Sequence, residues 1–86
     1  MITSLQNPRF KLLRSLRLRK RREQEGYFLI EGVRIVEEAL ACAAPVDTIV
    51  YAPDLLVSER AQALVEQVDP DRRLALSAEA FRSLSD

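Results

Sequence analysis

Basic side chains are concentrated in the first quarter of this 86-residue chain. Residues 1–22 carry eight lysines and arginines and no acid, while the remainder carries five basic residues and all thirteen acids. The two parts therefore have formal charges of +8 and −8 within a chain of zero net charge. Such segregation favours a polyanionic partner, because lysine and arginine neutralise phosphates and release their counterions. A solvated helix face that keeps the chain in solution is the alternative. The eight basic residues within positions 1–22 are Arg9, Lys11, Arg14, Arg17, Arg19, Lys20, Arg21 and Arg22.

The basic residues must be positioned by a helix, and the sequence marks its start. Asn7 can accept hydrogen bonds from free backbone N–H groups, and Pro8 suits the first helical position. We therefore predict a helix from residue 8 to about residue 24, ended by Gly26. Apolar residues share one face: Leu12, Leu13 and Leu16, with Phe10 at its edge. Basic residues share the opposite face: Lys11, Arg14, Arg21 and Arg22. This pattern predicts one side packed on a core and a basic stripe on the other.

The composition offers little for catalysis. The chain has no histidine and a single cysteine, Cys42, so it lacks the usual general base, an internal disulfide and a metal-ligand cluster. We expect no catalytic residue and no metal in this segment. No apolar run approaches the roughly 18 residues of a membrane-spanning helix, and no secretion signal is visible. We expect a soluble, cytoplasmic chain with no membrane partner.

An apolar, aromatic run follows the basic segment at residues 27–30, "YFLI". It predicts a short strand with both faces covered. Tyr27 and Phe28 have two interpretations, as core residues of that strand or as platforms on which bases stack, and the strand favours the core.

Gly32 ends this strand and begins a second predicted helix, which runs to about residue 43. Its apolar residues predict a broad buried face, and Cys42 on that face is interpreted as an inert buried thiol.

The rest of the chain alternates strands and helices. We predict a strand at residues 46–52, a helix from about Ser58, a turn at residues 69–71, a strand at residues 73–76 and a last helix from Ser77. Alternation of this kind is typical of an α/β layered sandwich with a small central sheet. The last helix reaches Asp86 without a stop signal, so we expect residues 1–86 to be one domain cut from a longer protein.

Two charged residues flank the start of the second predicted helix. Arg34 lies in the first turn, where a cation opposes the helix dipole, so an anion is expected nearby. That anion is either a local carboxylate (Glu31, Glu37 or Glu38) or a phosphate of the polyanionic partner, bound by the free N–H groups that follow Gly32. Glu31 itself either orients a basic residue or accepts hydrogen bonds from the helix start.

Two stretches together resemble a known family. The sequences "SLQNPRFKLLRSL" and "GYFLIEGVRIVEEAL", with Arg22 between them, resemble the N-terminal substrate-binding domain of SpoU/TrmH-type RNA ribose methyltransferases of the SPOUT superfamily. Beyond Ala44 only the alternation of elements fits. The matching positions are Asn7, Pro8, Lys11, Leu16, Arg22, Gly26, Phe28, Glu31, Gly32, Glu38 and Ala39.

The resemblance implies a fold and a function. In that family this domain is a three-layer α/β/α sandwich similar to kink-turn-binding ribosomal proteins, and it holds rRNA or tRNA for a separate knotted domain. The knotted domain binds S-adenosylmethionine, methylates a ribose 2′-hydroxyl and commonly forms the homodimer. Its motifs are absent here, so we expect no cofactor in this segment.

The resulting prediction is an RNA-binding domain of an RNA 2′-O-methyltransferase. Two alternatives are a stand-alone kink-turn-type RNA-binding protein and a basic-helix module that binds a protein or an anionic membrane. The residues predicted to contact RNA are Asn7, Lys11, Arg14, Arg21, Arg22, Gly32 and Arg34.

Overall fold

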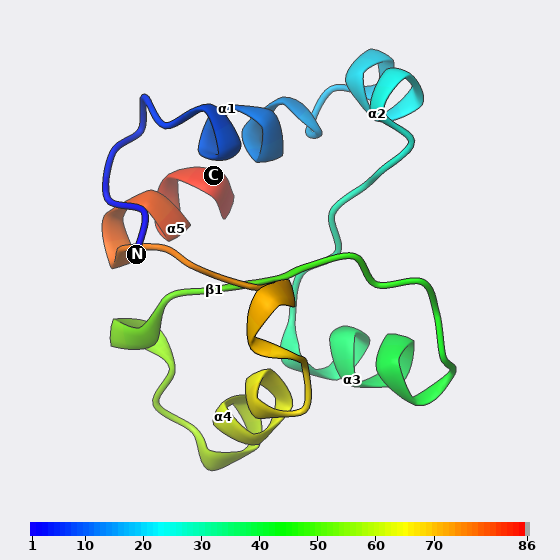
Figure 1. The fold of residues 1–86 in the computed structure, drawn as a ribbon, viewed down its shortest axis with the longest axis vertical. Helices are drawn as coiled ribbons and strands as arrows, with labels where there is room; N and C mark the ends of the chain where they lie inside the picture. The colour runs from blue at the N-terminus through cyan, green and yellow to red at the C-terminus, as the bar shows by residue number, and fades with distance from the viewer. Residues whose placement is uncertain (86) are drawn as a thin grey trace.

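The computed structural model describes residues 1–85, which form five α-helices and a small parallel sheet (Figure 1). Two short 3₁₀ helices, η1 (Pro53–Leu55) and η2 (Pro70–Arg72), occupy connections. The helices and strands, in order, are α1 (Pro8–Ser15), α2 (Arg19–Glu25), α3 (Val33–Ala41), β1 (Ile49–Tyr51), α4 (Glu59–Glu66), β2 (Arg73–Ala75) and α5 (Ala78–Ser85).

The sheet consists of two parallel strands. Ile49 pairs with Arg73, Val50 with Leu74 and Tyr51 with Ala75. An isolated parallel bridge joins Ile2 to Leu76, so β2 has backbone partners on both sides. The predictions of strands at residues 46–52 and 73–76 are confirmed, although each paired segment is shorter than predicted.

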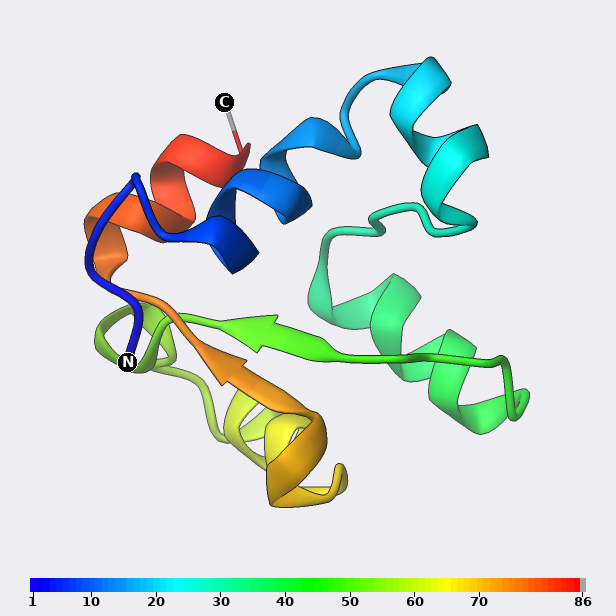
Figure 2. The same cartoon turned by 45° about the horizontal axis from the view of Figure 1, so that its top comes forward.

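Helices lie on both faces of this sheet, with α1 and α5 on one side and α3 and α4 on the other (Figure 2). Phe10 of α1, Ala80 of α5 and Leu74 of β2 form one core cluster, against which Val50 packs. The neighbouring Ile49 belongs to a second cluster with residues of α4 and α3. Successive strand residues thus serve opposite faces, as strand geometry requires. The mixed α/β class is confirmed, whereas the three-layer sandwich of the kink-turn-binding type stays a prediction because only two short strands pair.

The predicted continuous helix over residues 8–24 is wrong. Helix α1 ends at Ser15, the N–H groups of residues 16–18 bond three residues back, and α2 starts at Arg19 (Figure 1). The Ser15 hydroxyl also donates to the Leu12 carbonyl, at 2.6 Å. Hydrogen bonds to the residue three back give a tighter, 3₁₀-type turn at the end of the helix. In this turn Leu16 is 5% exposed, whereas Leu18 is 64% exposed. The chain therefore leaves the α-helical pattern at Leu16 and resumes it at Arg19.

The predicted buried strand at residues 27–30 is also wrong. These residues join no sheet, and their side chains are exposed. The physical reason is the absence of a neighbour: β1 pairs with β2, and no described strand lies along residues 27–30. An apolar run is a strand only where another strand satisfies its backbone.

The second predicted helix forms, but its apolar face is only partly covered. Val36 and Leu40 of α3 pack beside the second core cluster, while Ile35 is 46% exposed. No residue of α3 is fully buried. Cys42, interpreted from the sequence as a buried thiol, is exposed and lies directly after the last residue of α3.

Candidate nucleic-acid interface

The basic residues lie on α1, on the turn after it and on α2. Two of them form ion pairs within α2: Arg19 Nε lies 3.1 Å from Glu23 Oε1, and Arg21 Nη2 lies 3.0 Å from Glu25 Oε1. The other six have no ion pair with any carboxylate of residues 1–85. They are therefore available to phosphates without first breaking a salt bridge. These six are Arg9, Lys11, Arg14, Arg17, Lys20 and Arg22.

The predicted basic stripe does not form as one straight line. Lys11 and Arg14 belong to α1, whereas Arg21 and Arg22 belong to α2, and the turn between the helices separates the two pairs. The structure therefore brings the four residues onto one bent segment rather than onto one helix face.

Arg22 has a structural role that sequence reasoning missed. Its Nη1 donates to the carbonyl oxygens of Leu16, at 3.2 Å, and Arg17, at 2.9 Å. These carbonyls lie at the C-terminal end of α1, where a cation is favoured by the helix dipole. Arg22 thus fixes the angle between α1 and α2. The sequence gives only a weak signal for this role of Arg22. Its position six residues after Leu16 becomes informative only once the helix is known to break between them.

Asn7 caps α1, as its position before Pro8 predicts. Its Oδ1 accepts from the N–H groups of Arg9, at 2.8 Å, and Phe10, at 3.4 Å. The side-chain oxygen is therefore occupied by the helix start. The contact of Asn7 with RNA stays a prediction.

Two shallow hollows flank Phe28, beside α2. One, of about 340 Å³, has Tyr27 in its wall; the other, of about 440 Å³, has Leu29. Phe28 and Arg22 line both, and Phe28 itself is 73% exposed. An exposed aromatic side chain and at least two arginines therefore line each hollow. The first hollow is lined by Arg19, Arg22, Glu23, Gly26, Tyr27 and Phe28, the second by Leu16, Arg17, Arg22, Phe28 and Leu29.

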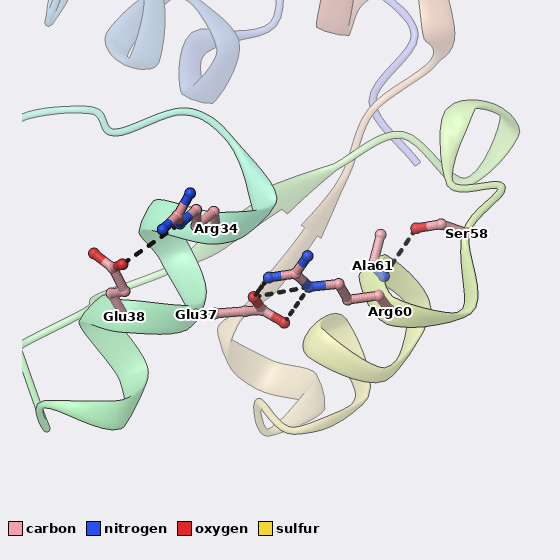
Figure 3. A network of polar contacts seen from close by, with 6 residues as sticks. All are labelled: Arg34, Glu37, Glu38, Ser58, Arg60 and Ala61. Atoms are coloured by element: carbon pink, nitrogen blue, oxygen red, sulfur yellow. Dashed lines mark hydrogen bonds and ion pairs between the residues drawn. The ribbon is translucent and has the colours of Figure 1, made fainter.

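The start of α3 holds the other predicted contacts, Gly32 and Arg34. Gly32 has φ +118°, a conformation that favours glycine, and it precedes the first residue of the helix. Arg34 Nε lies 3.8 Å from Glu38 Oε1 in an exposed pair, so a local carboxylate supplies the predicted anion (Figure 3). Within residues 1–85, Glu31 makes neither predicted contact and instead accepts a hydrogen bond from the Ser85 hydroxyl, at 2.5 Å. Contact of Gly32 and Arg34 with RNA stays a prediction.

An interhelical ion pair ties α3 to α4. Arg60 Nε donates to both carboxylate oxygens of Glu37, at 2.9 Å each, and Arg60 Nη2 donates to Glu37 Oε1 (Figure 3). The hydrogen bonds from Arg60 lower the pKa of Glu37 below its ordinary value. The nearby Ser58 caps α4 by accepting from the Ala61 N–H, at 3.1 Å. These contacts position α3 and contribute no chemistry of their own.

That this segment binds no S-adenosylmethionine stays a prediction. Arginines line both hollows and would repel its positively charged sulfonium. Both glycines, Gly26 and Gly32, sit at helix ends rather than in a loop that could wrap a nucleoside. No group of three histidine, cysteine or acidic residues within residues 1–85 is arranged to hold a metal ion. None of the helices described here is both long and apolar enough to cross a membrane.

A bent, basic helical segment with an exposed aromatic ring beside it is typical of nucleic-acid-binding domains. The comparisons with known proteins agree with this class. The chain belongs to the family of the MRM3-like substrate binding domain, whose model matches residues 7–86. This match confirms the resemblance seen in the sequence.

One relative adds a second line of evidence. The chain is 52% identical over 40 residues to a Synechocystis sp. protein whose name is "uncharacterized tRNA/rRNA methyltransferase". The aligned part covers 46% of this chain and 15% of that protein, so the chain matches a small part of its relative. No solved structure matches the chain.

Proposed function

We propose that this chain is the RNA-binding domain that recognises the substrate of an S-adenosylmethionine-dependent RNA ribose 2′-O-methyltransferase, with rRNA or tRNA as the substrate. Membership of a substrate-binding family and the name of the Synechocystis relative support this proposal. The observation that carries it is the basic segment of α1 and α2, where six of eight cations have no carboxylate partner in residues 1–85.

The role of the basic segment is to hold RNA by its phosphates. Each lysine or arginine that neutralises a phosphate releases a counterion, so affinity falls as salt rises, with a log–log slope of about −0.7 per contact on single strands. Contacts of this kind fix position without reading bases. Lys11 and Arg14, on the exposed side of α1, and Arg22, on α2, are the proposed phosphate contacts. Arg21 is proposed to join them by exchanging its carboxylate partner, Glu25, for a phosphate.

Methyl transfer is proposed to reside in residues outside this chain. S-adenosylmethionine would supply the methyl group there, and dimerisation would occur through that catalytic domain, in the cytoplasm. The arginine-lined hollows do not suit the cofactor, so we expect calorimetric titration of the chain with S-adenosylmethionine to show no binding.

Titration of a structured RNA over a range of salt concentrations tests the RNA-binding role. The double variant Lys11→Gln, Arg14→Gln should flatten the log–log slope by about 1.4, because two phosphate contacts are lost.

Arg60→Gln is the matched control, since it removes a positive charge from α4, on the opposite side of the sheet from α1 (Figure 2). It should leave the slope unchanged. A double variant that stays folded by circular dichroism and keeps the parent's slope would contradict the proposed role of α1.

A further inference from the structure

The side chain of Phe28 is exposed in a way that the fold does not explain. It is 73% exposed, although the chain contains only three phenylalanines and Phe10 is fully buried. Within residues 1–85 it belongs to neither core cluster. A large exposed aromatic side chain beside other exposed apolar groups marks an interaction surface.

The backbone around Phe28 is held in place at both ends. Gly26 ends α2 in a left-handed conformation, with φ +75°, and its N–H donates to the Arg22 carbonyl at 2.9 Å. The Tyr27 hydroxyl donates to Asp47, at 3.4 Å. Gly32 then begins α3. The ring of Phe28 is thus presented from a short connection anchored between two helices.

The charges around Phe28 identify the partner. Arg19 and Arg22 line one of the two hollows that include Phe28, and Arg17 and Arg22 line the other. Glu23 is the single acid among the lining residues. Three arginines beside the ring favour a partner that carries negative charge. A nucleic acid strand uses both features, since its bases stack on aromatic rings and its phosphates pair with arginines.

The geometry points to unpaired RNA bases as the groups that contact the ring of Phe28. A base inside a duplex has both faces covered by its neighbours, whereas an unpaired base can insert beside an exposed ring. We infer that Phe28 is a stacking platform for unpaired bases of RNA, with Arg17 and Arg22, neither of which is paired with a carboxylate of residues 1–85, contacting the adjacent phosphates. This inference rests on the proposed RNA-binding function and adds to it the kind of RNA that is held: a single-stranded segment, loop or bulge.

A pair of oligonucleotides separates stacking from phosphate binding. One is a single-stranded RNA of roughly 10 nucleotides, and the other is an abasic strand of the same length and charge. Phe28→Ala should weaken binding of the base-containing RNA by about 5- to 150-fold, the range expected for the loss of one stacked base. Its affinity for the abasic strand should equal the parent's, because the arginines are intact.

Three further variants act as controls. Phe28→Leu keeps an apolar side chain without a ring and should weaken binding of the base-containing RNA as alanine does. Phe28→Trp should retain affinity, and RNA should quench its fluorescence, which is unambiguous because the chain has no tryptophan. Val57→Ala removes another exposed apolar side chain, 86% exposed, and should bind both strands like the parent.

The outcomes distinguish this inference from the proposed function. If the parent binds RNA with a steep salt dependence but Phe28→Ala binds both strands as the parent does, the stacking platform is refuted and the RNA-binding role stands. If Phe28→Ala lowers thermal stability and leaves the preference for bases unchanged, Phe28 is a structural residue and the inference is again refuted. If the parent binds neither strand, the proposed function fails as well.

Discussion

Residues 17–48 differ in packing from the rest of the chain. All eleven buried core residues of the described chain lie outside this segment, at positions 10 and 16 and between 49 and 80. Six of the nine large hydrophobic residues that are exposed lie within it. One part of the molecule therefore supplies most of the stability, and the other presents apolar and basic side chains outward. The difference suggests that residues 17–48 are shaped for contact with a partner.

The two phenylalanines, Phe10 and Phe28, make this contrast measurable. Phe10→Ala should destabilise the fold by about 3–5 kcal/mol, because it leaves a cavity under α1 and α5. Phe28→Ala should change stability by no more than about 0.5 kcal/mol, as expected for a surface substitution. Urea unfolding measures both. A loss for Phe28→Ala comparable to that for Phe10→Ala would show that residues 17–48 belong to the core.

A second prediction concerns the backbone inside residues 17–48. Gly32→Ala should cost about 1–3 kcal/mol, because φ +118° is strained for any residue with a Cβ. The cost is conformational, since an added Cβ would meet only Ile35 Cγ2, at 3.8 Å. Thermal unfolding checks the change, with Arg34→Ala as a control that should leave the midpoint unchanged because its ion pair is long and exposed. Equal midpoints of thermal unfolding for the parent and Gly32→Ala would contradict this prediction, because they would show that the backbone at residue 32 adopts another conformation without cost.

The smallest expected effect is the pH dependence of the contact that joins the two parts. Arg60 lowers the pKa of Glu37 from its ordinary value of 4.5. The stabilisation that this ion pair gives the folded state is therefore complete above pH 4.5, and it is lost as the pH falls through the lower pKa of Glu37 in the folded state. Glu37→Gln should therefore be slightly less stable than the parent at neutral pH and equal to it in strong acid. Arg60→Gln should show the same loss at neutral pH. A stability difference between parent and Glu37→Gln that grows on acidification would have the wrong sign for this pair.

The sequence predicts the elements whose signals are local. Asn7 before Pro8 starts α1, Gly26 ends α2, and Gly32 begins α3, because caps and left-handed turns depend on neighbouring residues alone. The alternation of strands and helices after Ala44 is likewise confirmed. The mixed α/β class and the family could therefore both be recognised before the structure was known.

The features that sequence reasoning missed depend on distant contacts. At the break between α1 and α2, Leu16 is buried in the core and Arg22 donates hydrogen bonds to carbonyls at the end of α1. The run at residues 27–30 has the composition of a strand, yet no described strand accompanies it. Both errors affect the candidate site. The first divides the basic stripe, and the second turns two supposed core aromatics into exposed ones.

Amide hydrogen exchange tests most directly whether the loosely packed segment is the RNA-binding surface. None of the N–H groups of residues 27–31 donates a hydrogen bond to a described residue, whereas β1 and β2 pair along their length. In the free chain, residues 27–31 should exchange at nearly the rate of an unfolded peptide, and the strands far more slowly. Addition of a single-stranded RNA should slow exchange at residues 27–31 and leave the strands unchanged. Slow exchange at residues 27–31 without RNA would contradict the account, because it would place them in the packed core.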